Sequence, residues 1–155
     1  MTSLMWACFN NHEQCARALL EAKADPNKAN NNGFTSLMYA CQNGHELCAR
    51  ALLEAKADPE KPKSDGFTAL MISCQMGHEP CARALLEAGE GAAVNHVAAN
   101  GATALIIAAV AGKESCIQPL LDAGVDREID IPGMGNALQI AEGQGHTAIC
   151  SLLSV

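Results

Sequence analysis

The sequence predicts an all-α solenoid built from repeated units of helix, turn, helix and loop. A Thr-x-Leu pair recurs along the whole chain, at Thr2/Leu4, Thr35/Leu37, Thr68/Leu70 and Thr103/Leu105, with Asn136/Leu138 as a degenerate fifth copy. The steps between copies are 33, 33, 35 and 33 residues, and self-similarity at such a period is the signature of a repeat architecture. The apolar residues after each pair follow a helical spacing.

Residues 33–65 show one unit most clearly. The first helix is predicted from apolar residues that share one face, Leu37, Met38, Ala40 and Cys41. Gly44 ends this helix, because glycine takes the left-handed conformation without a Cβ clash. The second helix is predicted from Cys48, Ala49, Leu52 and Leu53, and residues 57–59 close the unit. We expect Leu53, and Leu86 in the next unit, to lie in the core.

At these residues the chain resembles the ankyrin repeat. The family pattern is Gly-x-Thr-Pro-Leu-His-x-Ala-Ala-x-x-Gly-His, followed by an apolar helix that ends Leu-Leu-x-x-Gly-Ala-Asp-x-Asn. The second unit matches it at Gly33, Thr35, Leu37, Ala40, Gly44, His45, Leu52, Leu53, Ala57 and Asp58. The third unit matches it at Gly66, Thr68, Leu70, Gly77, His78, Leu85 and Leu86. The resemblance covers one domain, residues 1–155, with repeats at about 1–32, 33–65, 66–100, 101–133 and 134–155.

The terminal units differ from the middle ones. No earlier repeat covers the apolar residues of the first helix, Leu4, Met5, Trp6 and Ala7. We therefore expect either a fragment of a longer array or an artificial chain boundary. We expect a monomer, with self-association through the exposed terminal repeats as the alternative. In the fifth unit, Gln139 and Glu142 bring the polarity of a closing repeat, and the glycine-rich loop before it, residues 129–135, is expected to be mobile.

Three local departures from the pattern are expected to change the structure. Lys23 and Lys56 stand where the family usually has glycine, which argues against a left-handed helix stop at either position. Two extra residues around Glu90-Gly91 lengthen one loop, either as length drift of little cost or as part of a binding face. Pro119 falls inside a predicted helix and should bend or loosen it.

The eight cysteines follow the repeat. One position of successive units holds Cys15, Cys48, Cys81 and Cys116, and another holds Cys8, Cys41 and Cys74. Because both positions carry buried apolar residues in the ankyrin family, we expect cysteine to act as a small buried hydrophobe. The alternatives are a disulfide framework, or a metal site with His12, His45, His78 and His146. Zinc ligands must converge on one point, whereas equivalent residues of a stack form a ladder, so we predict no metal and no cofactor.

The sequence contains no catalytic constellation. Thr35, Thr68 and Thr103 precede apolar helical runs and are expected to cap helices, and the histidines that follow glycines recur with the scaffold. The sequence contains no Ser/His/Asp set, no paired carboxylates at special positions, no Walker-type loop and no dinucleotide fingerprint, so we predict that the protein is not an enzyme. With neither a signal segment nor an apolar run of membrane-spanning length, we expect a cytoplasmic or nuclear protein that is not secreted and keeps its cysteines reduced.

The charge is unevenly distributed. Residues 1–63 hold seven Lys/Arg and seven Asp/Glu, whereas residues 64–155 hold three and ten, so the net charge of −7 lies entirely in the second segment. Binding to nucleic acid or anionic membranes needs clustered Lys/Arg, so we predict neither. A basic segment of another protein is the better-matched partner. The alternative is an acidic surface that serves solubility alone.

The resemblance implies binding of another protein through loop tips and the exposed ends of the first helices, on the concave side. The corresponding residues are Asn31, Asn32, Phe34, Gln42, Asn43, Ser64, Asp65, Phe67, Gln75, Met76, Ala99, Asn100, Ala102 and Val110. Phe34 and Phe67 are either binding anchors or residues that pack the loops together. Packing rather than recognition is expected for one further column, Trp6, Tyr39, Ile72, Ile107 and Ile140.

These observations together predict a non-catalytic protein-binding module. Two alternatives stay open. The chain could be a structural, engineered or fragment scaffold with no specific partner, which the near-identity of residues 15–26 and 48–59 favours. It could also bind metal through cysteine and histidine.

Overall fold

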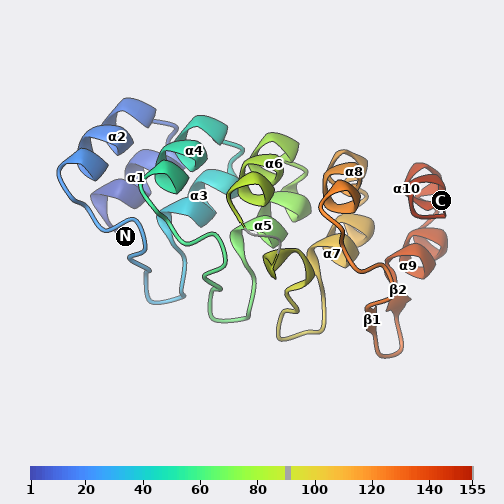
Figure 1. Ribbon diagram of the computed structural model, residues 1–155. Coiled ribbons are helices and arrows are strands. Elements are labelled where there is room, and N and C mark those ends of the chain that lie inside the picture. Colours follow the sequence, from blue (N-terminus) through green and yellow to red (C-terminus); the bar gives the residue numbers. More distant parts are fainter. Residues whose placement is uncertain (90–91, 155) are drawn as a thin grey trace.

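The structure is a computed structural model that describes residues 1–89 and 92–154, and it consists of helix pairs joined by loops (Figure 1). The first helices of the pairs are α1 (Ser3–Phe9), α3 (Ser36–Gln42), α5 (Ala69–Met76), α7 (Ala104–Val110) and α9 (Ala137–Gln144). The second helices are α2 (Glu13–Glu21), α4 (Glu46–Glu54), α6 (Glu79–Ala88), α8 (Glu114–Asp122) and α10 (Thr147–Leu153). The loops carry a short 3-10 helix, η1 (Ala92–Asn95), and two strands, β1 (Asp130–Ile131) and β2 (Gly135–Asn136).

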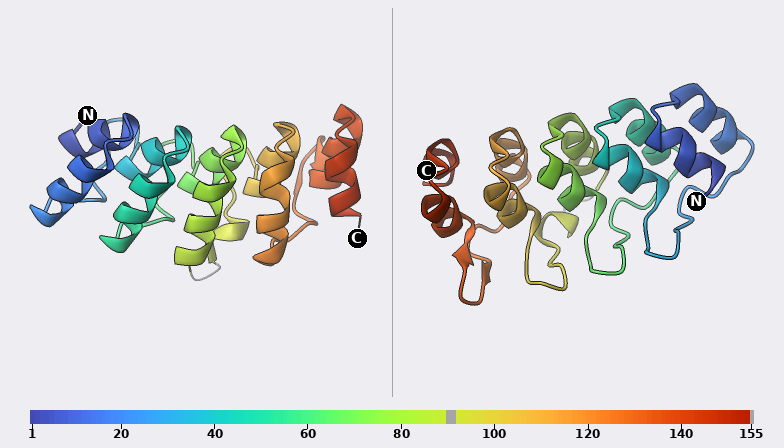
Figure 2. Two further views of the ribbon diagram at one scale, coloured as in Figure 1. Left: turned by 90° about the horizontal axis from the view of Figure 1, so that it is seen from above. Right: turned by 180° about the vertical axis from the view of Figure 1, so that it is seen from behind.

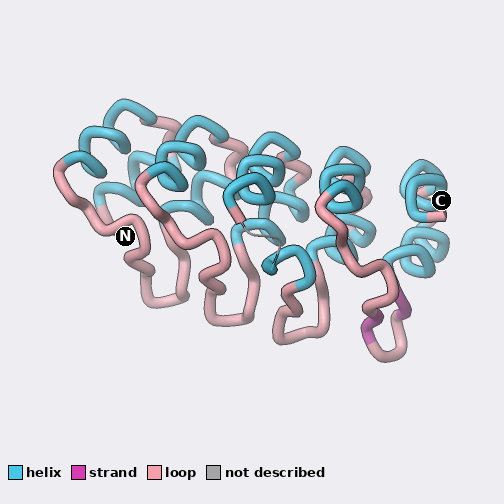
Figure 3. The backbone as a smooth tube through the Cα atoms, viewed as in Figure 1, coloured by secondary structure: helices cyan, strands magenta, loops and turns pink. Residues whose placement is uncertain are grey.

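The helices form two layers. Each first helix contacts the first helix of the next pair, from α1 to α9, and each second helix does the same from α2 to α10. We call these the inner and outer helices, because the long loops, which we call finger loops, all project from the stack on the side of the first helices (Figures 1 and 3). The two termini lie at opposite ends of the stack (Figure 2). The prediction of an all-α solenoid of stacked helix pairs is confirmed.

Threonine starts the inner helices, as the sequence predicts. The Oγ1 atoms of Thr2, Thr35, Thr68 and Thr103 each accept a hydrogen bond from the backbone N–H three residues later, over 3.2–3.4 Å. This bond satisfies one of the backbone donors that a helix leaves free at its N-terminus. In the fifth unit Asn136 takes the same role, since its Oδ1 accepts from the N–H of Gln139 over 3.1 Å. The degenerate fifth copy therefore keeps the capping chemistry.

The expectation against a left-handed helix stop at the two lysines is wrong. Lys23 and Lys56 both have φ = 65°, the conformation that Gly124 adopts at the same place in the fourth unit with φ = 76°. Two hydrogen bonds hold the turn after α4, from Lys56 N to the carbonyl oxygen of Leu53 over 3.0 Å and from Ala57 N to that of Leu52 over 2.9 Å. Closure of the helix end thus prevails over the unfavourable contact of the lysine Cβ.

The core lies between the two layers, and it differs from the prediction at the paired leucines. Leu52 and Leu85 are 0% and 3% exposed, whereas Leu53 and Leu86 are only half-buried at the edge of the core. The expectation that the second leucine of each pair is a core residue is therefore only partly correct. Successive helical residues point about 100° apart, so only one leucine of a pair can face directly between the layers.

Pro119 does not end its helix. α8 continues from Glu114 to Asp122 and has nine residues, the same number as α4. The first turn of α8 departs from regular α-helical bonding. There Cys116 N donates to the carbonyl oxygen of Lys113, three residues back rather than four, over 3.1 Å. Pro119 itself is buried, so its ring contributes to the packing that holds the helix.

The loop before α9 is a paired hairpin where the sequence predicted a mobile loop. β1 and β2 pair in antiparallel register, with Asp130 opposite Asn136 and Ile131 opposite Gly135. The hairpin also packs inward, because Ile131 contacts the edge of the core. Strands of two residues are too short to show an alternating pattern in the sequence. The predicted insertion around Glu90-Gly91 lies outside the described residues.

Candidate protein-binding face

The exposed side chains of the inner helices, together with the finger loops, form a surface that we call the inner face. One column of equivalent residues crosses it, and in this column Ile72, Ile107 and Ile140 are 4–7% exposed, as expected for packing residues. Tyr39 is half-buried, but Trp6 is 55% exposed, so the expectation of packing is wrong for Trp6. In the described chain α1 has an inner neighbour, α3, on one side only, and no neighbour covers the indole.

Aromatic rings continue from Trp6 into the second unit. The ring centroids of Trp6 and Phe9 are 6.1 Å apart with an interplanar angle of 82°, and those of Phe9 and Tyr39 are 5.9 Å apart at 83°. Such edge-to-face pairs are favourable because the positive edge of one ring meets the negative face of the next. Phe9 is 40% exposed, so two neighbouring aromatic residues lie open at this end of the inner face.

Phe34 and Phe67 occupy equivalent positions in two finger loops, where both are half-buried and pack against the core. The Nζ atom of Lys63 lies 5.7 Å from the ring centroid of Phe34 and 5.0 Å from that of Phe67. This cation–π arrangement ties one loop to the next. Of the two roles considered for these phenylalanines, the contacts favour packing the loops together.

Lys63 also forms an ion pair with Asp65, a candidate binding residue at the tip of the second finger loop. Partial desolvation raises the pKa of Asp65, but hydrogen bonds from Lys63 and from the backbone N–H of Phe67 outweigh it and lower the pKa below its usual value. Asp65 is therefore a carboxylate at neutral pH that is paired with Lys63 within the loop.

The candidate residues predicted from sequence divide by exposure. Eight of the predicted binding residues are exposed, Asn31, Asn32, Ser64, Asp65, Gln75, Met76, Asn100 and Val110, and so is Ala99. Four are half-buried, Phe34, Gln42, Asn43 and Phe67. Ala102 is only 4% exposed and belongs to the core, so it leaves the candidate surface. The prediction missed Trp6 and Phe9, although their helical positions match those of Tyr39 and Gln42, and this register is the signal that could have identified them.

Backbone hydrogen bonds join neighbouring finger loops. Ser64 N donates to the carbonyl oxygen of Asn32 over 3.2 Å, and Ala99 N donates to that of Asp65 over 3.1 Å. Nearer the helices, Asn27 Oδ1 accepts from Asp58 N over 2.7 Å, which links the first loop to the second. The tips of the first three finger loops are therefore held as one edge rather than as independent segments.

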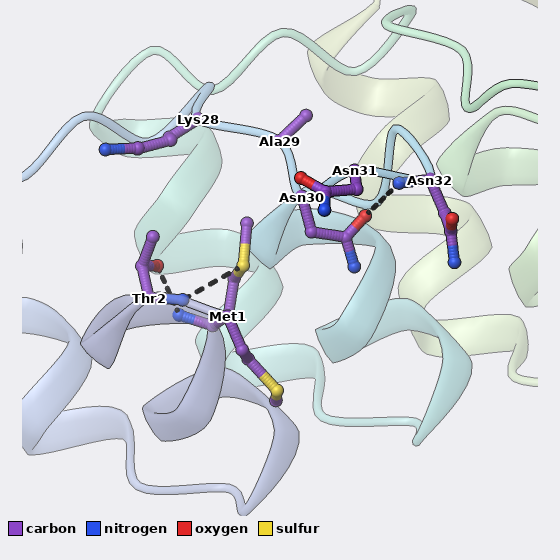
Figure 4. A pocket seen from close by; sticks show the side chains of 8 residues that line it. Met1, Thr2, Lys28, Ala29, Asn30, Asn31 and Asn32 are labelled. Atoms are coloured by element: carbon purple, nitrogen blue, oxygen red, sulfur yellow. Dashed lines mark hydrogen bonds between the residues drawn. The ribbon is translucent and has the colours of Figure 1, made fainter.

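A pocket of about 510 Å³ lies beside the first finger loop, where α1 begins (Figure 4). Met1, Thr2, Met5 and residues 28–32 line it. Asn30 Oδ1 accepts from Asn32 N over 2.9 Å and shapes the loop at its wall. The lining offers amide, hydroxyl and ammonium groups but contains no carboxylate, histidine or cysteine among the described residues, so it lacks a general base and a set of metal ligands.

Charged side chains gather on the outer helices. Arg17 pairs with Glu13 over 2.7 Å and with Glu54 of the next unit over 2.8 Å, and Arg50 repeats the pattern one unit later with Glu46 and Glu87. In contrast, the described residues of the inner helices include one charged side chain, Glu142. The acidic excess of the sequence therefore lies on the outer helices and the loops, and the inner helices are almost uncharged.

The cysteines are all free, and six of the eight are buried. Thiols of neighbouring units interact, Cys41 with Cys81 and Cys74 with Cys116, and the Cys116 thiol also lies 4.0 Å from the carbonyl oxygen of Ser73. The interactions between thiols, together with burial, raise the pKa values of Cys41 and Cys74 well above their usual range. Burial is as predicted for the repeated positions except Cys15, which is exposed on α2. Within the part of the chain that the structure describes, no three metal-ligating side chains converge.

The histidines that follow helix-ending residues contact the preceding unit. His45 Nε2 lies 3.1 Å from the carbonyl oxygen of Phe9. The His78 ring lies against Gly44, where an added Cβ would come within 2.7 Å of it. These histidines therefore connect neighbouring units. In the described residues every buried side-chain nitrogen or oxygen has a hydrogen-bond partner, so no unpaired polar group marks a catalytic centre.

The stacked helix pairs and their loops place the chain in the class of helical repeat proteins. Comparison with protein families identifies the family of repeats. The family model described as "Ankyrin repeats (3 copies)" matches residues 1–63 and 55–131. The chain therefore belongs to the ankyrin repeat family. Ankyrin repeats are generally protein–protein interaction modules, and the family is generally non-catalytic.

A search of curated proteins gives no match to this chain. Among the described residues, no helix combines the length and the apolar character needed to cross a membrane.

Proposed function

We propose that this protein is a non-catalytic module that binds a partner protein through its inner face, including the tips of the finger loops. One observation carries the proposal. Large apolar side chains, Trp6, Phe9, Met76 and Val110, are each 40–55% exposed on inner helices that hold almost no charge. Exposed apolar side chains that share one face of a molecule are typical of an interaction surface.

The charge distribution bears on the kind of partner. Nucleic acid needs clustered Lys/Arg, and the inner helices offer none among their described residues. The predicted attraction of a basic segment would come from acidic residues beside the contact, such as Asp126, Glu128 and Asp130 in the last finger loop. Charges at that distance favour the rate of association more than the affinity.

The test is a cross-linking pull-down from cells that express the protein, with Met76→Asp and Leu47→Asp as a matched pair. Both residues are exposed, 46% and 57%, but Met76 lies on the inner face and Leu47 on the outer helix α4. Each variant adds one carboxylate. We expect a partner that is captured by the native chain and by Leu47→Asp and is lost with Met76→Asp, because the new charge would have to be desolvated at the contact.

Circular dichroism of both variants serves as the control that they keep their helices. Equal capture by both variants would place the contact away from this part of the inner face. Capture of no reproducible partner by the native chain would instead support a scaffold without a specific partner.

A further inference from the structure

We propose that the charged side chain of Lys63 holds the first and second finger loops together as one rigid pair, and that this link depends on charge rather than on packing. The first loop comprises residues 22–35 and the second residues 55–68, and the two lie side by side (Figure 1). The inference goes beyond the proposed function, because it concerns how the loops are held before any partner binds. It is therefore tested without a partner.

The Lys63 ammonium group has contacts in both loops. It lies 5.7 Å from the ring centroid of Phe34 in the first loop and 5.0 Å from that of Phe67 in the second. It also pairs with the carboxylate of Asp65 at the tip of the second loop. The Lys63 side chain is only 19% exposed, so these contacts are partly shielded from water and are stronger than at an open surface.

The link lies at a point where the two backbones touch. Gly33 in the first loop has φ = 81°, and a Cβ added there would come within 2.8 Å of Lys63 Cα and 2.9 Å of Ser64 N. Beside it, Ser64 N donates a hydrogen bond to the carbonyl oxygen of Asn32 over 3.2 Å. The absence of a side chain at Gly33 thus lets the first loop reach the backbone around Lys63.

The equivalent residue of the first loop acts in a different way. Asn30, Lys63 and Ala98 occupy one position of three successive loops, where the backbone N–H of each donates to a carbonyl oxygen four residues later. Asn30 Oδ1 accepts from the N–H groups of Asn32 and Phe34, over 2.9 Å and 3.0 Å, and so closes its own loop. A lysine side chain has no acceptor and cannot close a loop in this way.

In the second loop another residue supplies the missing acceptor. Asp65 Oδ1 accepts from Phe67 N over 3.1 Å, and its other carboxylate oxygen pairs with Lys63. Closure of the second loop therefore leaves the Lys63 charge available to contact the first loop. The third loop is joined to the second differently, because His96 Nε2 lies 3.0 Å from the carbonyl oxygen of Gly66.

A rigid pair of loops would present its exposed tips at a fixed spacing. The tips carry four of the candidate binding residues, Asn31, Asn32, Ser64 and Asp65. Loops that are already ordered lose less conformational entropy when a partner binds. The competing explanation is that the two phenylalanine rings, which both pack against the core, hold the loops without any help from the charge.

The experiment measures the exchange of individual backbone amides by NMR on the full chain. The Ser64 amide reports on the link, because its hydrogen bond crosses from one loop tip to the other. The Asp58 amide is the internal reference, since it donates to Asn27 Oδ1 over 2.7 Å and joins the same two loops nearer the helices. Each rate is compared with that of the unfolded variant, which corrects for the changed neighbour.

Three variants separate charge from packing. Lys63→Asn introduces the residue that the equivalent position of the first loop already accommodates, and Lys63→Leu keeps apolar contact with the rings. In both we expect the Ser64 amide to exchange about tenfold faster while the Asp58 amide is unchanged. Lys28→Asn is the matched control, because it makes the same substitution at an exposed lysine of the first loop that has no ion pair in the described chain. It should change neither rate.

Three results would overturn the inference. Exchange of Ser64 at the native rate in Lys63→Asn would show that Lys63 does not link the loops. A native rate in Lys63→Leu alone would show that packing of the rings is sufficient. Equal acceleration at Asp58 would show that the loops loosen as a whole. None of these results depends on a captured partner, so the pull-down with Met76→Asp and Leu47→Asp tests the proposed function separately.

Discussion

At the residue scale, the two left-handed lysines show how tertiary packing sets a backbone conformation. An L residue in this conformation costs about 1–2 kcal/mol relative to a right-handed one. At Lys56 the cost is offset by the two hydrogen bonds that end α4 and by burial of Ala57, which is 5% exposed. The same turn follows α2 at Lys23, so both units carry the same local strain.

Lys56→Gly should therefore stabilise the protein. Glycine adopts φ = 65° without a Cβ clash, and its greater freedom in the unfolded chain offsets part of the gain, so we expect the free energy of unfolding to rise by about 0.5–1 kcal/mol. Urea unfolding followed by circular dichroism measures the change. Lys56→Ala is the control, because it removes the same exposed side chain but keeps the strain. An equal gain in both variants would show that the lysine side chain, and not the conformation, is responsible.

At the scale of the helix, the two leucines of each pair differ in how deeply they are buried. Leu52 of α4 is fully buried between the layers, while its neighbour Leu53 is half-buried at the edge of the core. Both are leucines in the same helix with the same helix propensity. Any difference in their contribution to stability comes from the packing of α4 against its neighbours.

Leu52→Ala is expected to lower the free energy of unfolding by about 2–5 kcal/mol, because it leaves a cavity in a close-packed region. Leu53→Ala in the same helix should cost about 1 kcal/mol, since solvent can reach part of the vacated space. Urea unfolding of the two variants tests which loss is larger. The midpoints are converted to free energies with the same dependence of the free energy of unfolding on urea concentration. Equal losses, or a larger loss for Leu53→Ala, would contradict the packing described for α4.

At the scale of the whole molecule, stability depends on contacts between adjacent helix pairs. Each inner helix contacts its inner neighbours and each outer helix its outer neighbours, and the Arg17 and Arg50 ion pairs follow the same nearest-neighbour pattern. Such a stack behaves as a sum of repeat terms and interface terms. A terminal pair has one interface in the described chain, whereas a middle pair has two.

Hydrogen exchange should therefore follow position in the stack. We expect backbone amides of α1, α2, α9 and α10 to exchange before those of α5 and α6, because a terminal pair opens by breaking one interface. Exchange measured by mass spectrometry on peptides from each helix tests this order, with the rates of the unfolded chain as the correction for intrinsic differences. Uniform protection along the chain would show that the molecule opens only as a single cooperative unit.

The candidate face was predicted less completely than the fold. The sequence pointed to the loop tips and the ends of the inner helices, and the structure places most of those residues at the surface. It assigned Trp6 to packing and did not single out Phe9. Neighbouring helices cover the residues that are equivalent to Trp6 in the middle units, and the sequence does not show that Trp6 itself is left exposed. Nor could it show that Phe34 and Phe67 pack around Lys63, since this contact joins two loops that are about thirty residues apart.

The layout of the fold was already present in the sequence. The helical spacing of apolar residues and the capping threonines are local signals that act within a few residues, and the period of the Thr-x-Leu pairs shows that these signals recur along the whole chain. The tertiary structure was needed for the rest. The left-handed turn at Lys56 runs against the preference of its own residue, and the strands β1 and β2 are too short to show a pattern in the sequence. The deeper burial of Leu52 than of Leu53 and the exposure of Trp6 depend on which side chains lie across an interface, and that information is absent from any single stretch of the chain.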